Sequence, residues 1–196
     1  ETYWDKKTFA PSSLLFYVGF DKKIENVSHH TLFFDTDFDA HAKEIYDKPQ
    51  WPTDPLFYAN FTSITDKTSA PAGKEAGFFL IPLAPGIEDT EALREAYFHK
   101  IMDRFEALTN QKVKKHVLFK KSFCVNDFKS EYNSYKGNAY GMANTLLQTA
   151  FLRPKIKSSK IKNLYFTGQL TVPGPGVPPA LISGKIASEL IFKNQL

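Results

Sequence analysis

Short apolar runs divided by polar turns fill most of the chain as far as residue 123 and predict β-strands. The clearest run is rich in aromatic residues and directly follows Pro11. The predicted strands cover residues 12–20, 31–34, 56–64, 77–83 and 113–120. Residues 65–74, between the third and fourth strands, are rich in Asp, Ser, Pro and Gly, so these two strands are expected to pair in antiparallel fashion.

One helix is predicted by a complete set of local signals, over residues 91–108. Its apolar residues recur at every third or fourth position and form one stripe. They are Leu93, Tyr97, Ile101, Phe105 and Leu108. Asp89 or Thr90 can cap the start of the helix, and Asn110 stands where a left-handed residue ends one.

The C-terminal part of the chain has a different pattern. Glycines and an asparagine predict a loop at 135–141, followed by a short helix over 142–152 and an apolar strand over 161–167. A turn rich in glycine and proline then leads into a helix over 180–192. One apolar strand with its helix cannot form a buried parallel sheet, so its neighbours must come from the earlier sheet or from a longer chain.

Together these elements predict an α+β fold. A mixed or antiparallel sheet with flanking helices is expected first, followed by a strand and a helix of a separate part. The change of pattern predicts a boundary that divides residues 1–135 from residues 136–196.

The composition is that of a soluble globular protein and excludes disordered, collagen-like and coiled-coil chains. The 196 residues are 42% hydrophobic and 23% charged. Aromatic residues make up 15% and fit either a thick core or a wide apolar cavity. No apolar run reaches the ~18 residues of a membrane-spanning helix, and no secretory leader begins the chain, so a cytoplasmic location is expected.

Charge adds little evidence for a polyanionic partner. The net charge is +4, and lysines cluster at 112–121 and 155–162. Arginine is scarce and no nucleic-acid-binding signature lies near these lysines, so no nucleic-acid partner is expected. Lysines of this kind solvate strand edges and turns. A second use for them is binding to anionic lipid.

Neither a metal site nor a nucleophile is predicted. The single cysteine, Cys124, excludes an internal disulfide and is expected to be a packed thiol at a buried strand end. His29 and His30 would point to opposite faces of a strand, and with His41 they form no ligand set. The acidic stretch 35–39 lacks the later glycine and glutamate of a calcium-binding loop, so it predicts a solvated turn and a helix cap.

The turn before the last helix is the segment most informative about chemistry. It contains Gly168, Gly174 and Gly176 and four prolines that stiffen it. A strand that runs through such a turn into a helix exposes backbone N–H groups and the positive helix end to a negatively charged ligand. The GxGxxG phosphate fingerprint is incomplete, because residues 174–179 lack its third glycine. An ordinary capped turn is the alternative.

The sequence resembles the bacterial phytoene desaturases, relatives of the amine-oxidase-like flavoproteins. Their C-terminal flavin motif is similar to residues 163–191, NLYFTGQLTVPGPGVPPALISGKIASELI. The resemblance continues upstream through YNSYKGNAYGMANTLLQTAFLRP, QWPTDPLFYAN, FFLIPLAPG and APSSLLFYVGFD. It implies an FAD-dependent carotenoid desaturase that converts phytoene toward lycopene. It also implies that this chain is the C-terminal portion of such an enzyme, without the GxGxxG unit that holds the FAD pyrophosphate.

The resemblance assigns roles to both parts of the chain. Residues 1–135 are expected to belong to a substrate-binding domain, and residues 136–196 to supply the closing strand and helix of a Rossmann-like FAD-binding domain. The residues implied to contact FAD are Gly168, Gln169, Thr171, Pro173, Gly174, Gly176, Val177 and Pro178. Tyr140, Asn144 and Gln148 are implied to border the substrate, with ordinary packing as the alternative. No catalytic residue is implied, and the chain alone is expected to be inactive and not to bind FAD.

Other interpretations remain open. A carotenoid isomerase or saturase, or a desaturase of a shorter polyene, would share the flavin motif, whereas a non-enzymatic lipid- or polyene-binding module would bind an apolar ligand without flavin. The uncharged polyene substrate implies a protein peripheral to the membrane, on its cytoplasmic side. Apolar surface around residues 161–167, without a covering partner, predicts homo-oligomers or aggregation.

Overall fold

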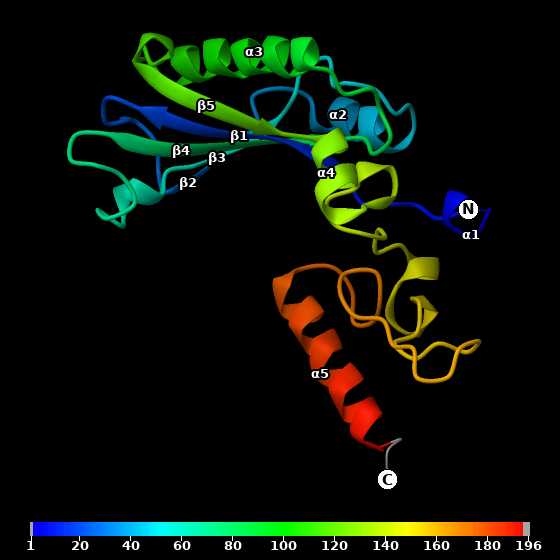
Figure 1. Ribbon diagram of the computed structural model, residues 1–196. Coiled ribbons are helices and arrows are strands. Elements are labelled where there is room, and N and C mark those ends of the chain that lie inside the picture. The colour runs from blue at the N-terminus through cyan, green and yellow to red at the C-terminus, as the bar shows by residue number, and fades with distance from the viewer. Residues whose placement is uncertain (1, 194–196) are drawn as a thin grey trace. The chain divides into compact units, whose positions relative to one another are not determined.

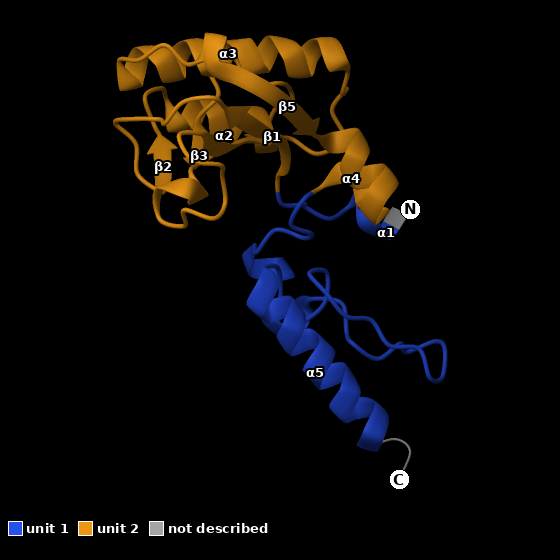
Figure 2. Cartoon of the chain, turned by 60° about the vertical axis from the view of Figure 1, so that its left-hand side comes forward, with its two compact units in different colours: residues 1–10, 139–196 blue, residues 11–138 orange. Residues whose placement is uncertain are grey.

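The computed structural model describes residues 2–193 and divides into two compact units (Figure 2). The larger unit is Pro11–Asn138, and the smaller unit joins the residues up to Ala10 with those from Ala139 onward. The substrate-binding and flavin-binding roles assigned to the two sides of residue 135 stay a prediction.

The larger unit is built on a five-stranded sheet with the order β2-β3-β4-β1-β5, in which every pairing is antiparallel (Figure 1). The strands are β1 (Ser12–Phe20), β2 (His30–Phe33), β3 (Phe57–Asn60), β4 (Glu75–Leu83) and β5 (Val117–Phe123). The predicted antiparallel pairing of the strands on either side of 65–74 is confirmed, with Tyr58 opposite Leu80. The α+β class is therefore confirmed for this unit.

β3 is shorter than predicted because a 3₁₀ turn follows it. The strand ends at Asn60, and Thr62–Ile64 forms the turn, so the predicted strand to residue 64 is wrong. The Ser63 hydroxyl donates to the buried Glu75 carboxylate and accepts from the Ala76 N–H at 3.1 Å. These hydrogen bonds turn the chain inward where an extended strand would continue.

β5 begins later than predicted for a similar reason. Lys114–His116 is a 3₁₀ turn, so the strand starts at Val117 rather than at residue 113. The buried Glu106 carboxylate accepts from the N–H groups of Val113 and Lys114 at 2.7 and 2.9 Å. Burial raises the pKa of Glu106, but these hydrogen bonds outweigh burial and hold the pKa below its usual value.

The predicted long helix is confirmed as α3 (Glu91–Thr109). The Thr90 hydroxyl accepts from the Leu93 N–H at 3.3 Å, which fulfils the predicted cap. Asn110 has φ 51° and ends the helix in the left-handed region, as predicted.

The buried face of α3 is wider than the predicted stripe. Tyr97, Ile101 and Phe105 are buried as expected, together with Phe98 and Met102. With 3.6 residues per turn, the face centres between Ile101 and Phe105, so Leu108 falls at its edge. Leu108 is 48% exposed, which corrects the predicted stripe at this end.

Like α3, the other two helices of the larger unit begin at side-chain hydrogen bonds. The predicted cap in the acidic stretch is confirmed: Asp37 accepts from the N–H groups of Asp39 and Ala40, and α2 (Phe38–Tyr46) follows. The second of them, α4 (Val125–Tyr132), was not predicted from the sequence.

Cys124 is the N-cap residue of α4 rather than part of a strand end. Its N–H donates to the Asp127 carboxylate at 2.8 Å. The thiol is buried, and burial raises its pKa to about 12. A neutral, inaccessible thiol is a poor nucleophile, so the prediction of a packed thiol is confirmed.

The core lies between α3 and one face of the sheet (Figure 1). Phe105 is fully buried, and its ring centroid lies 5.5–5.8 Å from those of Phe33, Phe61 and Phe79. Phe16 contacts Phe98 of α3 at 5.1 Å. Part of the high aromatic content is therefore explained by this core.

Acidification is expected to destabilise the larger unit through His41 of α2. The buried ring donates from Nε2 to the Pro82 carbonyl at 2.9 Å and accepts the Leu56 N–H at Nδ1 at 3.1 Å, an arrangement that requires neutral imidazole. Burial lowers the pKa of His41 below 6.5. On acidification, His41 therefore becomes protonated at a higher pH in the unfolded chain than in the folded one. The contribution of neutral His41 to the free energy of unfolding is complete above pH 6.5 and is lost as the pH falls below that value.

Urea unfolding at a series of pH values between about 7.5 and 5 checks this prediction. Uptake of one proton on unfolding lowers the free energy of unfolding by at most about 1.4 kcal/mol for each pH unit of acidification. His41→Gln should flatten the acid-side slope. His99→Gln, which changes an exposed histidine of α3, is the matched control and should leave the slope intact. An identical slope in His41→Gln and the wild type would contradict the assignment.

The smaller unit contains α1 (Thr2–Asp5) and α5 (Val177–Lys193). The predicted strand over 161–167 is wrong: one antiparallel bridge joins Lys157 to Tyr165, and Asn163 turns the chain with φ 61°. Within the described part of this unit the segment finds only this local pairing, and a strand needs longer partners. The Rossmann-like character of this unit stays a prediction.

The predicted helix over 142–152 is also wrong. Leu146–Gln148 and Ala150–Leu152 form separate 3₁₀ turns. Thr149 between them is extended, and Ala150 has φ 48°. The Gln148 side chain hydrogen-bonds both backbone groups of Thr8 at 3.0 and 2.8 Å, which holds the segment open.

The last helix is confirmed and begins at Val177, three residues earlier than predicted. Pro178 and Pro179 fit its first turn, where backbone N–H groups have no partner within the helix. No helix among residues 2–193 is both long and apolar enough to cross a bilayer.

Candidate functional site

The residues predicted to contact flavin lie together on the turn that enters α5. Thr171 and Gly174 are buried, and Gly168 and Gln169 are half-buried. The remaining four are exposed, namely Pro173, Gly176, Val177 and Pro178. The turn therefore has an inner side that is packed and an outer side that is open.

The glycines of this turn occupy backbone conformations that other residues rarely adopt. Gly168, Gly174 and Gly176 have φ values of 104°, 141° and 110°. A Cβ atom at Gly168 would meet no atom within 4 Å, so space is open beside it. The Gly168 N–H donates to the Ser183 hydroxyl at 2.8 Å, and Ser183 donates to the Ala180 carbonyl at 2.6 Å, which ties the turn to α5.

The N-terminus of α5 has fewer free donors than an ordinary helix. Pro178 and Pro179 carry no N–H, and the Ala180 N–H bonds the Gly176 carbonyl at 3.0 Å. The N–H groups of Gly176 and Val177 have no acceptor within residues 2–193 and belong to exposed residues. Two donors without an acceptor thus belong to exposed residues at the positive end of the helix, where negative charge is favoured.

The three residues predicted to border substrate have different environments. The Asn144 side-chain oxygen accepts from Arg153 at 2.9 Å and would lie 3.7 Å from a Cβ at Gly174, so Asn144 is brought to the turn. Gln148 is buried and uses its amide to hold the backbone of Thr8. Tyr140 is 43% exposed.

Arg153 lies directly behind the turn and was not identified from the sequence. Its side chain is buried, and its Cζ atom would be 3.8 Å from a Cβ at Gly174. It donates to the carbonyl groups of Gln169 and Thr171 at 2.8 and 3.2 Å. The available signal was that Arg153 is one of only three arginines in a lysine-rich chain and directly follows the apolar pair Phe151–Leu152.

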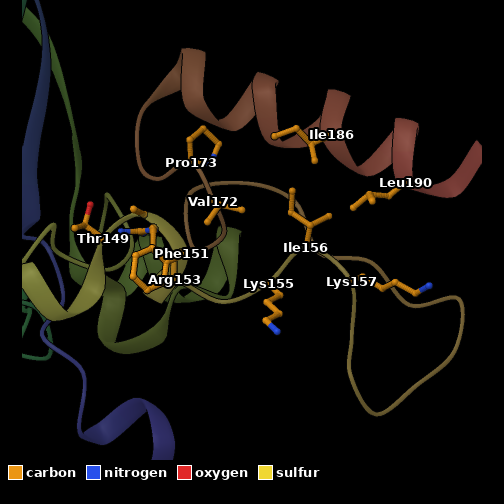
Figure 3. A pocket seen from close by; sticks show the side chains of 11 residues that line it. Thr149, Phe151, Arg153, Lys155, Ile156, Lys157, Val172, Pro173, Ile186 and Leu190 are labelled. Carbon is orange, nitrogen blue, oxygen red and sulfur yellow. The ribbon is translucent and has the colours of Figure 1, made fainter. Parts of the chain in front are cut away.

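A groove of about 780 Å³ runs beside the turn, between α5 and residues 149–157. Figure 3 shows Ile186 and Leu190 extending from α5 toward Ile156. Val172 and Pro173 of the turn also line the groove. The lining is mostly apolar, and the volume lies in the usual range of ligand pockets.

The second feature missed from the sequence is the face of the sheet opposite α3. Cross-strand partners share a face, so the register places Leu80 beside Leu15 and Tyr58, and Tyr17 beside Phe78. We call this surface the open sheet face. It comprises Leu15, Tyr17, Leu32, Tyr58, Phe78, Leu80, Phe119 and Phe123.

The open sheet face is mostly apolar and accessible, and the same register adds the polar residues His30, Asn60 and Lys121 to it. Tyr17, Leu32 and Phe119 are 46%, 60% and 62% exposed, and its other apolar members are half-buried. The Tyr17 and Phe78 rings are 5.2 Å apart, and the Phe119 ring covers Gly19, where a Cβ would lie 2.3 Å from it. A large exposed surface made mostly of apolar side chains is typical of a binding site.

The histidines do not assemble as a ligand set. His29 lies before β2, and its ring is 4.3 Å from that of His30, so the expectation that they point to opposite faces of a strand is wrong. Their Nδ1 atoms pair with the hydroxyl groups of Thr65 and Tyr58, each at 2.6 Å. Among residues 2–193, no three His, Cys, Asp or Glu side chains are placed to hold a metal ion.

Comparison with known proteins identifies relatives over nearly the whole chain, although no protein-family model matches. The chain is 42% identical over 194 residues to a carotenoid 3,4-desaturase of Haloarcula japonica, covering 99% of this chain and 39% of the relative. It is 31% identical over 199 residues to the 4,4'-diapophytoene desaturase (4,4'-diaponeurosporene-forming) of Staphylococcus aureus. It is 30% identical over 187 residues to the 4,4'-diapolycopen-4-al dehydrogenase of Metabacillus indicus.

The last two alignments each cover 95% of this chain and 38% of the relative. The chain thus spans about two fifths of the length of these relatives. The resemblance drawn from the sequence motifs is confirmed at the level of the family. The chain belongs to the carotenoid desaturase family.

Proposed function

We propose that this chain is the C-terminal part of an FAD-dependent carotenoid desaturase. The observation that carries the proposal is the similarity to proteins named as carotenoid and diapophytoene desaturases over 95–99% of the chain. The turn before α5 and the open sheet face supply the two surfaces that the reaction needs, one for a cofactor and one for a polyene.

The residues of the turn fit a flavin. Gly168 has open space where a side chain would stand, and the free N–H groups of Gly176 and Val177 suit an electron-rich edge. In this assignment Gly168 and Gln169 lie along the ribityl and phosphate portion, and Val177 opens the helix near the ring. The Thr171 hydroxyl and N–H both donate to the Gly168 carbonyl, at 3.0 and 3.2 Å, and the Thr171 carbonyl accepts from Arg153. The contribution assigned to Thr171 is therefore to hold the shape of the turn.

The remaining members of the turn, Pro173, Gly174 and Pro178, shape it around the ring. When bound, FAD supplies the hydride-accepting chemistry, and the protein orients the substrate and excludes water. The chain's own contribution is therefore binding and positioning. The catalytic residues of the parent protein are not assigned.

The open sheet face suits an acyclic polyene. A carotenoid carries no charge, and the face offers aromatic rings and leucines on five adjacent strands. Contact along such a surface removes apolar area from water at about 25 cal/mol per Å². We propose that the substrate lies along these strands, and that phytoene, converted toward lycopene, is that substrate.

The proposed partners follow from the same chemistry. A polyene is soluble in lipid rather than water, so the parent protein is proposed to work at a membrane surface. The exposed Ile161 and Phe166 favour self-association when no other surface covers them.

Reconstitution of the full-length protein with FAD and phytoene-loaded liposomes tests the function. Formation of products with added double bonds is expected. Leu32→Glu should lower the rate at least about tenfold, since it places a carboxylate against an apolar substrate. Leu108→Glu is the matched control, because Leu108 is exposed to a similar degree but lies on α3 away from the open sheet face, and it should keep the rate.

The possible results separate the alternatives. Double-bond isomers or saturated products would identify an isomerase or saturase. Polyene binding that is independent of FAD, without turnover, would identify a binding module and overturn the enzyme proposal.

A further inference from the structure

We infer that Arg153 is the positioning residue for the flavin-binding turn, and that its charge adds to the field the turn presents to the cofactor. The inference rests on the proposed function, which assigns flavin to this turn. It concerns a side chain outside the glycine- and proline-rich motif.

Arg153 joins two segments through one rigid group. Its acceptors are the carbonyl oxygens of Met142, Gln148, Gln169 and Thr171 and the side-chain oxygen of Asn144, at 2.8–3.4 Å. A guanidinium has five N–H donors fixed in one plane. Two of the acceptors belong to the turn and three to residues 142–148, so this plane fixes the turn against the preceding segment.

No other type of side chain at position 153 could make this set of hydrogen bonds. A lysine has three donors on a flexible stem and cannot reach acceptors in a common plane. Removal of the guanidinium would leave buried carbonyl groups without donors, because Thr171 is only 2% exposed. Each such group costs about 1–3 kcal/mol when left unsatisfied, so the turn would rearrange.

The charge of Arg153 has no counter-ion within the described part of the chain. Every acceptor is a neutral carbonyl or amide oxygen, and the side chain is 2% exposed. A buried charge is costly unless it is paired, and burial here lowers the pKa of the guanidinium from its usual value. Negative charge on a ligand at Gly174 would lie next to this cation and would be stabilised by it.

The consequence for a bound flavin has a definite sign. Reduction adds electrons to the cofactor, so a fixed positive charge behind the turn favours the reduced form. Arg153 is therefore expected to raise the midpoint potential of bound FAD as well as to shape its site. A purely structural role would change occupancy and stability but would not follow the charge of the side chain.

The test compares Arg153→Gln with Arg153→Lys in the full-length protein, by the ratio of FAD to protein and by the midpoint potential. Arg153→Gln should weaken FAD binding at least tenfold and lower the potential by about 30 mV or more, which is one tenfold change for a two-electron couple. Arg153→Lys should weaken binding but retain most of the potential. Arg104→Gln is the matched control: it removes a partly buried arginine of the larger unit, bound to Asp35, and should change neither quantity.

A measurement without flavin accompanies these. Hydrogen exchange of the backbone amides at 168–176 should accelerate in both Arg153 variants and not in Arg104→Gln. Wild-type protein that binds no FAD would overturn the proposed function together with this inference. Wild-type protein that binds FAD, with Arg153→Gln showing the same occupancy, potential and exchange, would overturn the inference alone. If Arg153→Gln does not fold, wild-type FAD occupancy and wild-type hydrogen exchange in Arg153→Lys would overturn the inference.

Discussion

Phe105→Ala is expected to lower the free energy of unfolding of the larger unit by about 3–5 kcal/mol. The side chain is fully buried, and the rings of Phe33, Phe61 and Phe79 surround it at 5.5–5.8 Å. These rings lie on three different strands or loops that the sheet holds in place, so they cannot close the cavity left by the missing ring. A loss of this size is a large fraction of the stability of an ordinary domain.

Urea denaturation followed by Trp51 fluorescence measures this effect in the right unit. Trp51 donates to the Glu88 carbonyl at 2.7 Å and packs on Tyr97 of α3, whereas Trp4 lies in the smaller unit and should first be replaced by Phe. Leu108→Ala changes an exposed residue of the same helix and should stay within about 0.5 kcal/mol of the parent. A Phe105→Ala loss close to that of the control would show that the core does not centre on this ring.

The larger unit was largely predictable because its signals are local. β1 was predicted with its observed bounds, and α3 with its cap at Thr90 and its stop at Asn110. The open sheet face was missed because apolar residues on both faces of β1 predict a strand buried on both sides. The sequence cannot show that much of one of these faces stays exposed, with α4 packing on it at Phe123 through the rings of Phe128 and Tyr132.

The smaller unit resisted prediction because its structure depends on contacts distant in sequence. Gln148 bonds Thr8, and Arg153 bonds Gln169 and Thr171, and such bonds leave no periodic pattern. The apolar pattern over 161–167 is that of a strand, yet strands form only with partners. The turn and α5 were predictable, since glycines, prolines and a helical period are local features.

Gly176→Val is expected to abolish tight flavin binding by the full-length protein. Gly176 has φ 110°, a region that costs other residues about 1–3 kcal/mol, and its N–H is one of the two free donors at the start of α5. Valine would drive the backbone toward negative φ and turn this N–H away. We expect FAD occupancy of the purified protein to fall at least tenfold, as measured from the ratio of flavin to protein absorbance.

Gly184→Ala is the matched control within α5. A Cβ there meets no atom within 4 Å and its backbone is helical, so occupancy should be unchanged and the helix more stable by about 0.5–1 kcal/mol. Gly176→Ala then separates two causes. Backbone strain alone predicts similar losses for alanine and valine, whereas crowding of the flavin predicts a larger loss for valine. Unchanged FAD occupancy in both Gly176 variants would contradict the assignment of this turn to the flavin site. In that case neither the backbone conformation of Gly176 nor the space beside it would affect binding of the cofactor.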